Sequence, residues 1–442
     1  MVRQGPVGLE AGTAQQSAII SQAFTPAAPR DIKETGLSVG MLTDLALKIL
    51  YFESYLAGRE LAVRMALPFA GVVDKVLDFL KRETLCEVRG ASGRGSLAAA
   101  SYEYVLTAKG RDMARDAIDR TQYTGPSPVP LVMYNESVRL QGLKEVVVHQ
   151  RQLRKALAHL VLNERTFEQI GPAVNSGRSM FLFGNPGNGK TSIAEAIGTL
   201  LMEGDIYMPY AVEIEGQIIK VFDDVNHIPV TDEASVRGVD PRWMKIRRPF
   251  IVVGGELTLE GLDLVYDTNN KYYEAPFQMK ANGGILLIDD FGRQQVRPRD
   301  LLNRWIVPLE KRLDFLTLHT GRKIEIPFEV LTVFSTNLEP KDLVDEAFLR
   351  RIRHKIEVTD PNWEEFREIF KRLSDIKEVP MDDRALAYLI QEHYIKAHRP
   401  PRACHPRDLL DQVIDIAEYL SVQPAMSKEL IDRAADSYFV EL

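Results

Sequence analysis

The feature that most constrains the fold is a glycine-rich loop between an apolar strand and a helix. The strand is expected at residues 180–183 and the helix at residues 192–202. Glycines allow backbone N–H groups to converge on phosphate oxygens, and the N-terminus of a helix adds positive potential. We therefore predict a phosphate-binding loop that fits the G-x-x-x-x-G-K-[ST] pattern. Its residues are Gly184, Asn185, Pro186, Gly187, Asn188, Gly189, Lys190, Thr191 and Ser192.

A second apolar strand ends in two carboxylates, Asp289 and Asp290, about a hundred residues after the loop. Alone, such a run indicates a strand that enters an acidic turn. After a phosphate-binding loop it indicates a Walker B strand. We expect Lys190 to reach the β- and γ-phosphates of a nucleotide, and Thr191 and Asp289 to hold Mg²⁺. Asp290 would then polarise the attacking water.

Composition narrows the class of protein. The 442 residues are 45% hydrophobic and 26% charged, which suggests about three globular domains. The net charge of −7 excludes an overall basic footprint for nucleic acid, although a local patch is compatible with it. Two cysteines cannot form a disulfide framework, and neither a signal peptide nor an apolar run of about 18 residues occurs. We expect a cytoplasmic protein without membrane insertion.

The chain divides into five segments by composition and periodicity. Helical spacing with two β-prone pieces resembles a winged helix-turn-helix domain, and alternating strand and helix signals predict parallel βαβ units. Asp360-Pro361 and Pro406 are typical of helix starts, with Asp360 as an N-cap. The segments are a flexible tail at 1–35, the winged-helix domain at 36–122, a linker at 123–145, the α/β core at 146–360 and a helical lid at 361–442.

Three further motifs complete a pattern that resembles the AAA+ ATPases over residues 143–442. Asn337 ends a β-run and matches the sensor 1 residue. The segment 345–352 resembles the one that carries the arginine finger, for which we favour Arg351 over the adjacent Arg350. Arg407, in the first turn of a lid helix, matches sensor 2. The alternative for the basic run at 350–355 is an ordinary solvated face.

This resemblance implies a fold, a reaction and an assembly. The fold is α/β: a P-loop core with a parallel sheet flanked by helices, then a helical lid. The reaction is hydrolysis of ATP to ADP and phosphate with Mg²⁺, in which Asp290, Asn337, Arg350 or Arg351, and Arg407 act as catalytic residues. An arginine finger that reaches a neighbouring subunit implies a homo-oligomer, in the form of a hexamer-like ring. Asp290 departs from the usual Glu, which leaves a nucleotide switch with negligible hydrolysis as an alternative.

Two insertions indicate a branch of the family. Residues 314–328 alternate apolar and polar side chains around Thr320-Gly321-Arg322, which predicts a hairpin. The hairpin resembles the pre-sensor-1 hairpin of MoxR-like, chelatase-like and σ54-activator-like members. The stretch from 210 to 276 exceeds a minimal core. In that branch such insertions project into the ring pore and act on a client.

The sequence leaves two functions open. The first is an ATP-hydrolysing machine that remodels a protein client. The second is an ATP-controlled DNA-binding regulator or loader that acts through residues 36–122. That segment carries 12 Lys and Arg against 11 Asp and Glu. DNA-reading domains normally have a basic surplus, so we favour the protein client.

Overall fold

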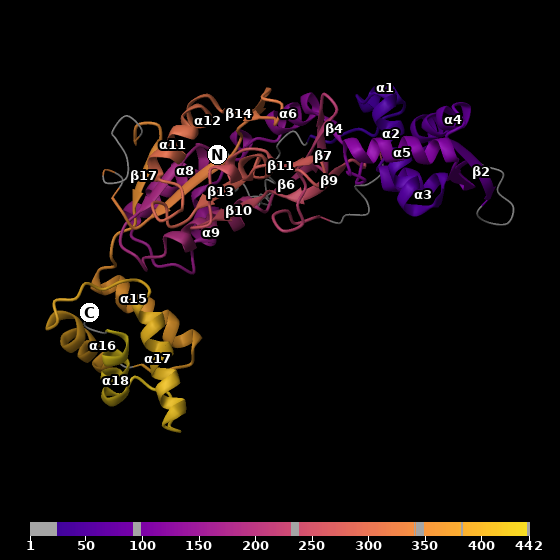
Figure 1. Ribbon diagram of the computed structural model, residues 1–442. Coiled ribbons are helices and arrows are strands. Elements are labelled where there is room, and N and C mark those ends of the chain that lie inside the picture. The colour runs from indigo at the N-terminus through magenta and orange to yellow at the C-terminus, as the bar shows by residue number, and fades with distance from the viewer. Residues whose placement is uncertain are drawn as a thin grey trace, which may run out of the picture.

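The computed structural model describes residues 24–91, 99–230, 238–339, 341, 349–381 and 383–439. An N-terminal helical domain lies at one end of the molecule, a sheet-containing core lies in the middle, and a helical lid lies at the other end (Figure 1). In the described parts of the chain, no helix is both long enough and apolar enough to cross a bilayer.

The core is a five-stranded sheet in the order β10-β13-β16-β5-β17, and every neighbouring pair is parallel. A parallel sheet is stable when both faces are covered. Met180 and Leu182 pack toward α7, α8 and α9, whereas Phe181 packs toward α11 and α12. The predicted fold class, an α/β core with a parallel sheet flanked by helices, is confirmed. The elements are β5 (Met180–Phe183), β10 (Phe250–Val253), β13 (Ile285–Ile288), β16 (Leu331–Thr336), β17 (His354–Glu357), α7 (Gln150–Ala156), α8 (Glu164–Asn175), α9 (Lys190–Leu201), α11 (Pro298–Arg304) and α12 (Ile306–Lys311).

A second five-stranded sheet, in the order β11-β12-β8-β7-β4, is built mainly from the long insertion. Its faces follow the period of two: Ile218 packs with the N-terminal domain, while Ile219 packs with the predicted hairpin. The hairpin is present as an antiparallel pair, β14 and β15. These elements are β4 (Val129–Pro130), β6 (Asp205–Pro209), β7 (Ala211–Ile214), β8 (Gln217–Lys220), β9 (Trp243–Arg247), η5 (Glu260–Leu262), β11 (Val265–Asp267), β12 (Tyr272–Glu274), α10 (Phe277–Lys280), β14 (Leu313–Thr317) and β15 (Lys323–Pro327).

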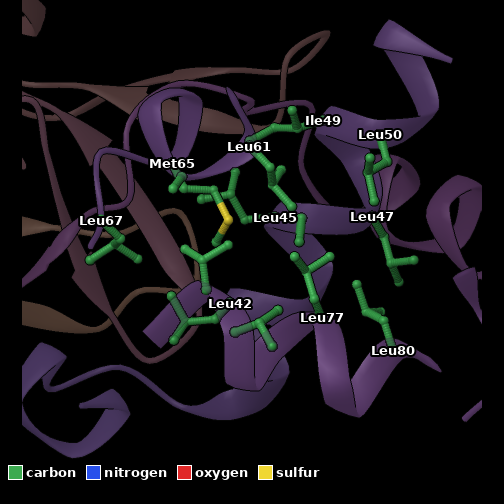
Figure 2. Packing of buried hydrophobic residues seen from close by; sticks show 14 of the residues in the cluster. Leu42, Leu45, Leu47, Ile49, Leu50, Leu61, Met65, Leu67, Leu77 and Leu80 are labelled. Atoms are coloured by element: carbon green, nitrogen blue, oxygen red, sulfur yellow. The ribbon is translucent and has the colours of Figure 1, made fainter. Parts of the chain in front are cut away.

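The N-terminal domain has the predicted order of three helices, a two-stranded ribbon and a final helix, around a leucine-rich core (Figure 2). One strand, β1, is additional and pairs with β3. The apolar periodicity of residues 69–83 predicts one helix, but the helix is interrupted because Gly71 has a φ of 84°, and its regular part begins at Asp74. The elements are α2 (Val39–Glu53), β1 (Tyr55–Ala57), α3 (Gly58–Met65), η1 (Phe69–Val73), α4 (Asp74–Arg82), β2 (Cys86–Ala91), η2 (Ala99–Ser101), β3 (Tyr102–Leu106) and α5 (Ala108–Arg120).

The predicted linker and the described part of the predicted tail, residues 24–35, contain helices, which corrects the prediction for these residues. The predicted tail spans residues 1–35, of which 1–23 lie outside the described residues. Residues 32–35 form α1 (Ile32–Thr35), and the ring of Phe24 packs edge-on against Trp243. The predicted linker at 123–145 contains α6 (Leu131–Leu140) and η3 (Leu143–Glu145). Prolines obscured α6 in the sequence, because Pro130 is itself the N-cap of this helix.

The lid is helical, as predicted, and the periodicity of residues 428–438, which predicts its last helix, matches the bounds of α18 (Lys428–Tyr438). Pro406 lies in the first turn of α17. Asp360 is not the N-cap of the first lid helix, α15: Asn362 caps it and forms a capping box with Glu365. The elements are α15 (Trp363–Ile376), α16 (Asp383–Leu389), η6 (Ile390–Ile395), α17 (His405–Tyr419) and α18 (Lys428–Tyr438).

Candidate active site

The glycine-rich loop connects β5 to α9 and lies against the start of the lid. Gly184 has a φ of 141°, and a Cβ there would lie 2.3 Å from the Val358 carbonyl oxygen. Gly189 has a φ of 84° and is the N-cap of α9; without a side chain it leaves the first N–H groups of this helix to a ligand. Of the other loop residues, Asn185, Pro186 and Gly187 are exposed, Asn188 is buried and Ser192 is half-buried.

Lys190 is buried at the centre of the site. Its Nζ donates to the Gly184 and Asn185 carbonyl oxygens, at 3.0 and 2.9 Å, and to Asn337 Oδ1 at 2.7 Å. Burial lowers the pKa of Lys190, the Asp289 and Asp290 carboxylates oppose this shift, and the Arg402 guanidinium adds to it. A phosphate oxygen would therefore give this ammonium group an anionic partner in place of neutral acceptors.

The acidic strand and the sensor strand bring three more predicted residues to the same edge of the sheet. The Thr191 hydroxyl lies 3.2 and 3.0 Å from the two carboxylate oxygens of Asp289. Asn337 Nδ2 donates to Asp290 Oδ1 at 3.1 Å, so one amide joins Asp290 to Lys190. The strands β13 and β16 are parallel neighbours. Their carboxyl ends therefore lie side by side and present these groups together.

Two of the predicted arginines, Arg407 and Arg351, donate hydrogen bonds to carboxylates outside this group. Arg407 Nε donates to Asp408 at 3.0 Å, and the Arg407 side chain is 62% exposed. Arg351 Nε donates to Glu310 at 2.6 Å, while Arg350 is exposed. Both hydrogen bonds join an arginine to a carboxylate outside the glycine-rich loop. Residues 342–348, part of the predicted finger segment, lie outside the described residues.

Two residues near the loop were missed by sequence reasoning. Asp360 accepts hydrogen bonds from Asn185 and Asn188. Arg402 is the lid cation that acts on Lys190. The capping box of Asn362 and Glu365 was a readable signal that Asp360 is free for another partner. Arg402 carried no comparable signal, because it precedes the lid helix in an irregular segment.

The side chains suit Mg²⁺ in their chemistry, because Thr191 and Asp289 offer only oxygen atoms, the ligands that hard cations prefer. The described residues hold no group of three or more His, Cys, Asp or Glu side chains placed to bind a metal ion. A cation beside Thr191 and Asp289 would thus take its remaining ligands from phosphate and water, which is typical of Mg²⁺.

Comparison with known proteins finds one family model that matches the lid and several solved structures that are similar at low sequence identity. A family model described as "Domain of unknown function (DUF8689)" matches residues 362–437, the helical lid. No curated protein matches the chain. Among solved structures, NtrX from Brucella abortus in complex with ATP is 14% identical, with 81% of this chain and 63% of NtrX covered and a TM-score of 0.36. The RuvB Holliday junction branch migration motor from Thermotoga maritima is 14% identical, with 69% and 74% covered and a TM-score of 0.33. The chain therefore spans less than two thirds of the NtrX structure.

Proposed function

We propose that the chain binds and hydrolyses ATP as an AAA+ protein. The observation that carries the proposal is the Asn337 amide, which contacts Lys190 through Oδ1 and Asp290 through Nδ2. One side chain thus links the group expected to bind the γ-phosphate to the group expected to act on water. The carboxyl ends of parallel strands are where α/β proteins bind ligands, which supports the proposal.

Each residue then has a role in binding or in water activation. The backbone N–H groups of the loop and the ammonium of Lys190 bind the phosphates. Thr191 and Asp289 would hold Mg²⁺, which when bound neutralises charge on the phosphates. Asp290 accepts a proton from water held near it, and Asn337 fixes the direction of the Asp290 carboxylate. The left-handed backbone of Asp290, with a φ of 47°, fixes this orientation further.

We further propose assembly into a homo-oligomeric, hexamer-like ring that remodels a protein client. The support is the basic segment after β16, where Arg350 is exposed and available to a neighbouring subunit. Arg351 is held by Glu310 and would have to leave it to reach a second nucleotide. In this proposal Arg350 is the better candidate for the finger, because it does not have to break the hydrogen bond to Glu310 that Arg351 makes, although the sequence favoured Arg351.

Phosphate release with Mg²⁺ and ATP tests both proposals. Lys190→Ala should abolish nucleotide binding, because it removes the only side-chain cation bonded to the loop carbonyls among the described residues. A finger variant, Arg350→Ala or Arg351→Ala, should keep ATP binding and lose turnover by about 10³–10⁵. The matched control is Arg353→Ala, a neighbouring exposed arginine, which should turn over as wild type does. Equal turnover in the wild type and the three arginine variants would contradict the finger, and absence of ATP binding by the wild type would contradict the whole proposal.

The alternative, a DNA-binding regulator, would act through α4 of the N-terminal domain. Lys81 on this helix pairs with Asp78 at 2.9 Å, which uses part of its basic charge within the helix. A fluorescence anisotropy titration with duplex DNA at several salt concentrations separates the two functions. A steep loss of affinity with salt would favour the DNA regulator, and absence of binding at low salt would favour the protein client.

A further inference from the structure

Both asparagines of the glycine-rich loop donate hydrogen bonds to one carboxylate, that of Asp360, which lies directly before the lid. Asn185 Nδ2 donates to Asp360 at 3.1 Å for Oδ1 and 2.9 Å for Oδ2, and Asn188 Nδ2 donates to Oδ1 at 2.7 Å. Hydrogen bonds to a charged acceptor are stronger than those between neutral groups. The conformation of the loop is therefore tied to Asp360.

Asn188 extends this connection to a second part of the lid. Its Oδ1 accepts from the Ala403 backbone N–H at 3.3 Å, directly before α17. Its Nδ2 also lies 3.4 Å from the Val358 carbonyl oxygen, at the end of β17. The Asn188 side chain is buried, so water does not compete freely for these partners. One loop side chain thus joins the last core strand, the root of the lid and the segment before α17.

Steric contact supports the same connection. A Cβ on Gly187 would lie 2.4 Å from the Cys404 sulfur, so the absence of a side chain at this position lets the loop lie against Cys404. The simpler role for Asp360, capping the first lid helix, is excluded because Asn362 performs it. The carboxylate of Asp360 is therefore available to the loop.

We propose that Asp360 is a positioning residue for nucleotide binding: it holds Asn185 and Asn188 so that the loop N–H groups keep their phosphate-binding geometry and the lid stays against the loop. The proposal rests on the ATP-binding function proposed above. Its physical basis is preorganisation, because a loop already held in its binding conformation loses less entropy when a ligand binds. The nucleotide and the lid contact would consequently stabilise each other.

Titration of the full chain with Mg²⁺ and ATP, together with steady-state phosphate release, tests the proposal. Asp360→Ala should weaken ATP binding about tenfold, the effect expected for lost charge-assisted hydrogen bonds. The larger effect should fall on KM rather than on kcat. Asp360→Asn, which keeps one acceptor oxygen for Asn188, should recover most of the affinity. Asn188→Ala should resemble Asp360→Ala, and the double variant should lose little more than either single variant.

The matched control is Glu357→Ala, which removes an exposed carboxylate from the strand that precedes Asp360. Wild-type affinity in Asp360→Ala, or additive losses in the double variant, would overturn the proposal. So would a lower kcat and unfolding midpoint with KM unchanged, because that is the signature of a merely structural residue. If the wild type binds ATP and Lys190→Ala does not, failure at Asp360 leaves the proposed function intact. If the wild type does not bind ATP, both proposals fail.

Discussion

The α/β core contacts its two flanking regions through different chemistry. Toward the N-terminal domain the contact is mainly apolar: Ile218 of the insertion sheet belongs to the leucine-rich core of that domain, and Tyr123 packs edge-on against Tyr272 at 5.7 Å. Backbone hydrogen bonds reinforce it, such as Gln122 N–H to the Asn270 carbonyl oxygen at 2.9 Å. Toward the lid, the contacts at the glycine-rich loop are amide and carboxylate groups around Asp360.

We call the contact of the core with the N-terminal domain the N-terminal joint and its contact with the lid the lid joint. Their different chemistry indicates which of the two can change during a reaction cycle. Separating apolar surfaces costs a free energy of about 25 cal/mol for each Å² exposed to water. The N-terminal domain and the core should therefore move as one rigid body. Hydrogen bonds can be exchanged for bonds to water or to a nucleotide at a small net cost. The lid is therefore the part expected to respond to the nucleotide (Figure 1).

Breaking the apolar joint should have the largest effect. Ile218→Ala removes a buried side chain, 4% exposed, from the interface with the N-terminal domain. We expect a loss of about 2–5 kcal/mol in the free energy of unfolding, measured by urea denaturation. The control is Val265→Ala on the exposed side of the same sheet, which should change stability by less than about 0.5 kcal/mol. Equal effects of the two variants would mean that the joint is not a shared core.

Bound nucleotide should stabilise the lid joint and leave the N-terminal joint unchanged. With Mg²⁺ and ATP at about a hundredfold above Kd, the bound state gains about 2.7 kcal/mol over forms that cannot bind. Hydrogen exchange should slow at the Ala403 amide, which donates to Asn188, and should stay unchanged at the Gln122 amide in the N-terminal joint. Lys190→Ala should abolish the slowing. Uniform slowing at both amides would contradict a rigid N-terminal joint.

Local patterns were the part that the sequence predicted well. The loop, the acidic strand and the hairpin each depend on neighbouring residues, and β5, β13 and β14–β15 lie where their patterns indicated. The hairpin, however, packs one apolar face against the insertion sheet, and Arg322 at its tip pairs with Glu215. Its apolar alternation was readable, but the surface that buries it comes from distant parts of the chain, such as Ile219 and Tyr273.

Long-range polar pairs could not be predicted for the same reason. Asn188 and Asp360 are 172 residues apart, and neither residue type alone indicates a partner. Helix α6 was hidden by nearby prolines, and it is held by tertiary contact: the Tyr134 hydroxyl donates to the Met279 carbonyl oxygen at 2.9 Å. Burial against a distant segment overrode the local composition in this helix.

Acid should destabilise the lid by a smaller amount, through a histidine of a kind that the N-terminal domain lacks. Burial, assisted by the Arg402 cation, lowers the pKa of His405 from 6.5 to about 4. The ring is buried in the lid, with Nδ1 3.1 Å from the Tyr394 hydroxyl, so a proton added to it would have to be placed in an apolar environment. Between pH 6.5 and pH 4 the unfolded lid binds a proton that the folded lid does not. Its stability is therefore full above pH 6.5 and falls as the pH drops toward 4.

Thermal unfolding followed by tryptophan fluorescence measures this effect, because one of the three tryptophans, Trp363, lies in the lid beside Tyr394. The decrease in the unfolding midpoint from pH 6.5 to pH 5 should be smaller in His405→Asn than in the wild type. His398→Asn is the matched control: His398 is exposed, and its φ of 49° is one that Asn tolerates. Because residues 1–148 contain no histidine, the N-terminal domain has no group of this kind. An equal pH dependence in both variants would show that carboxylates, rather than His405, control the acid response of the lid.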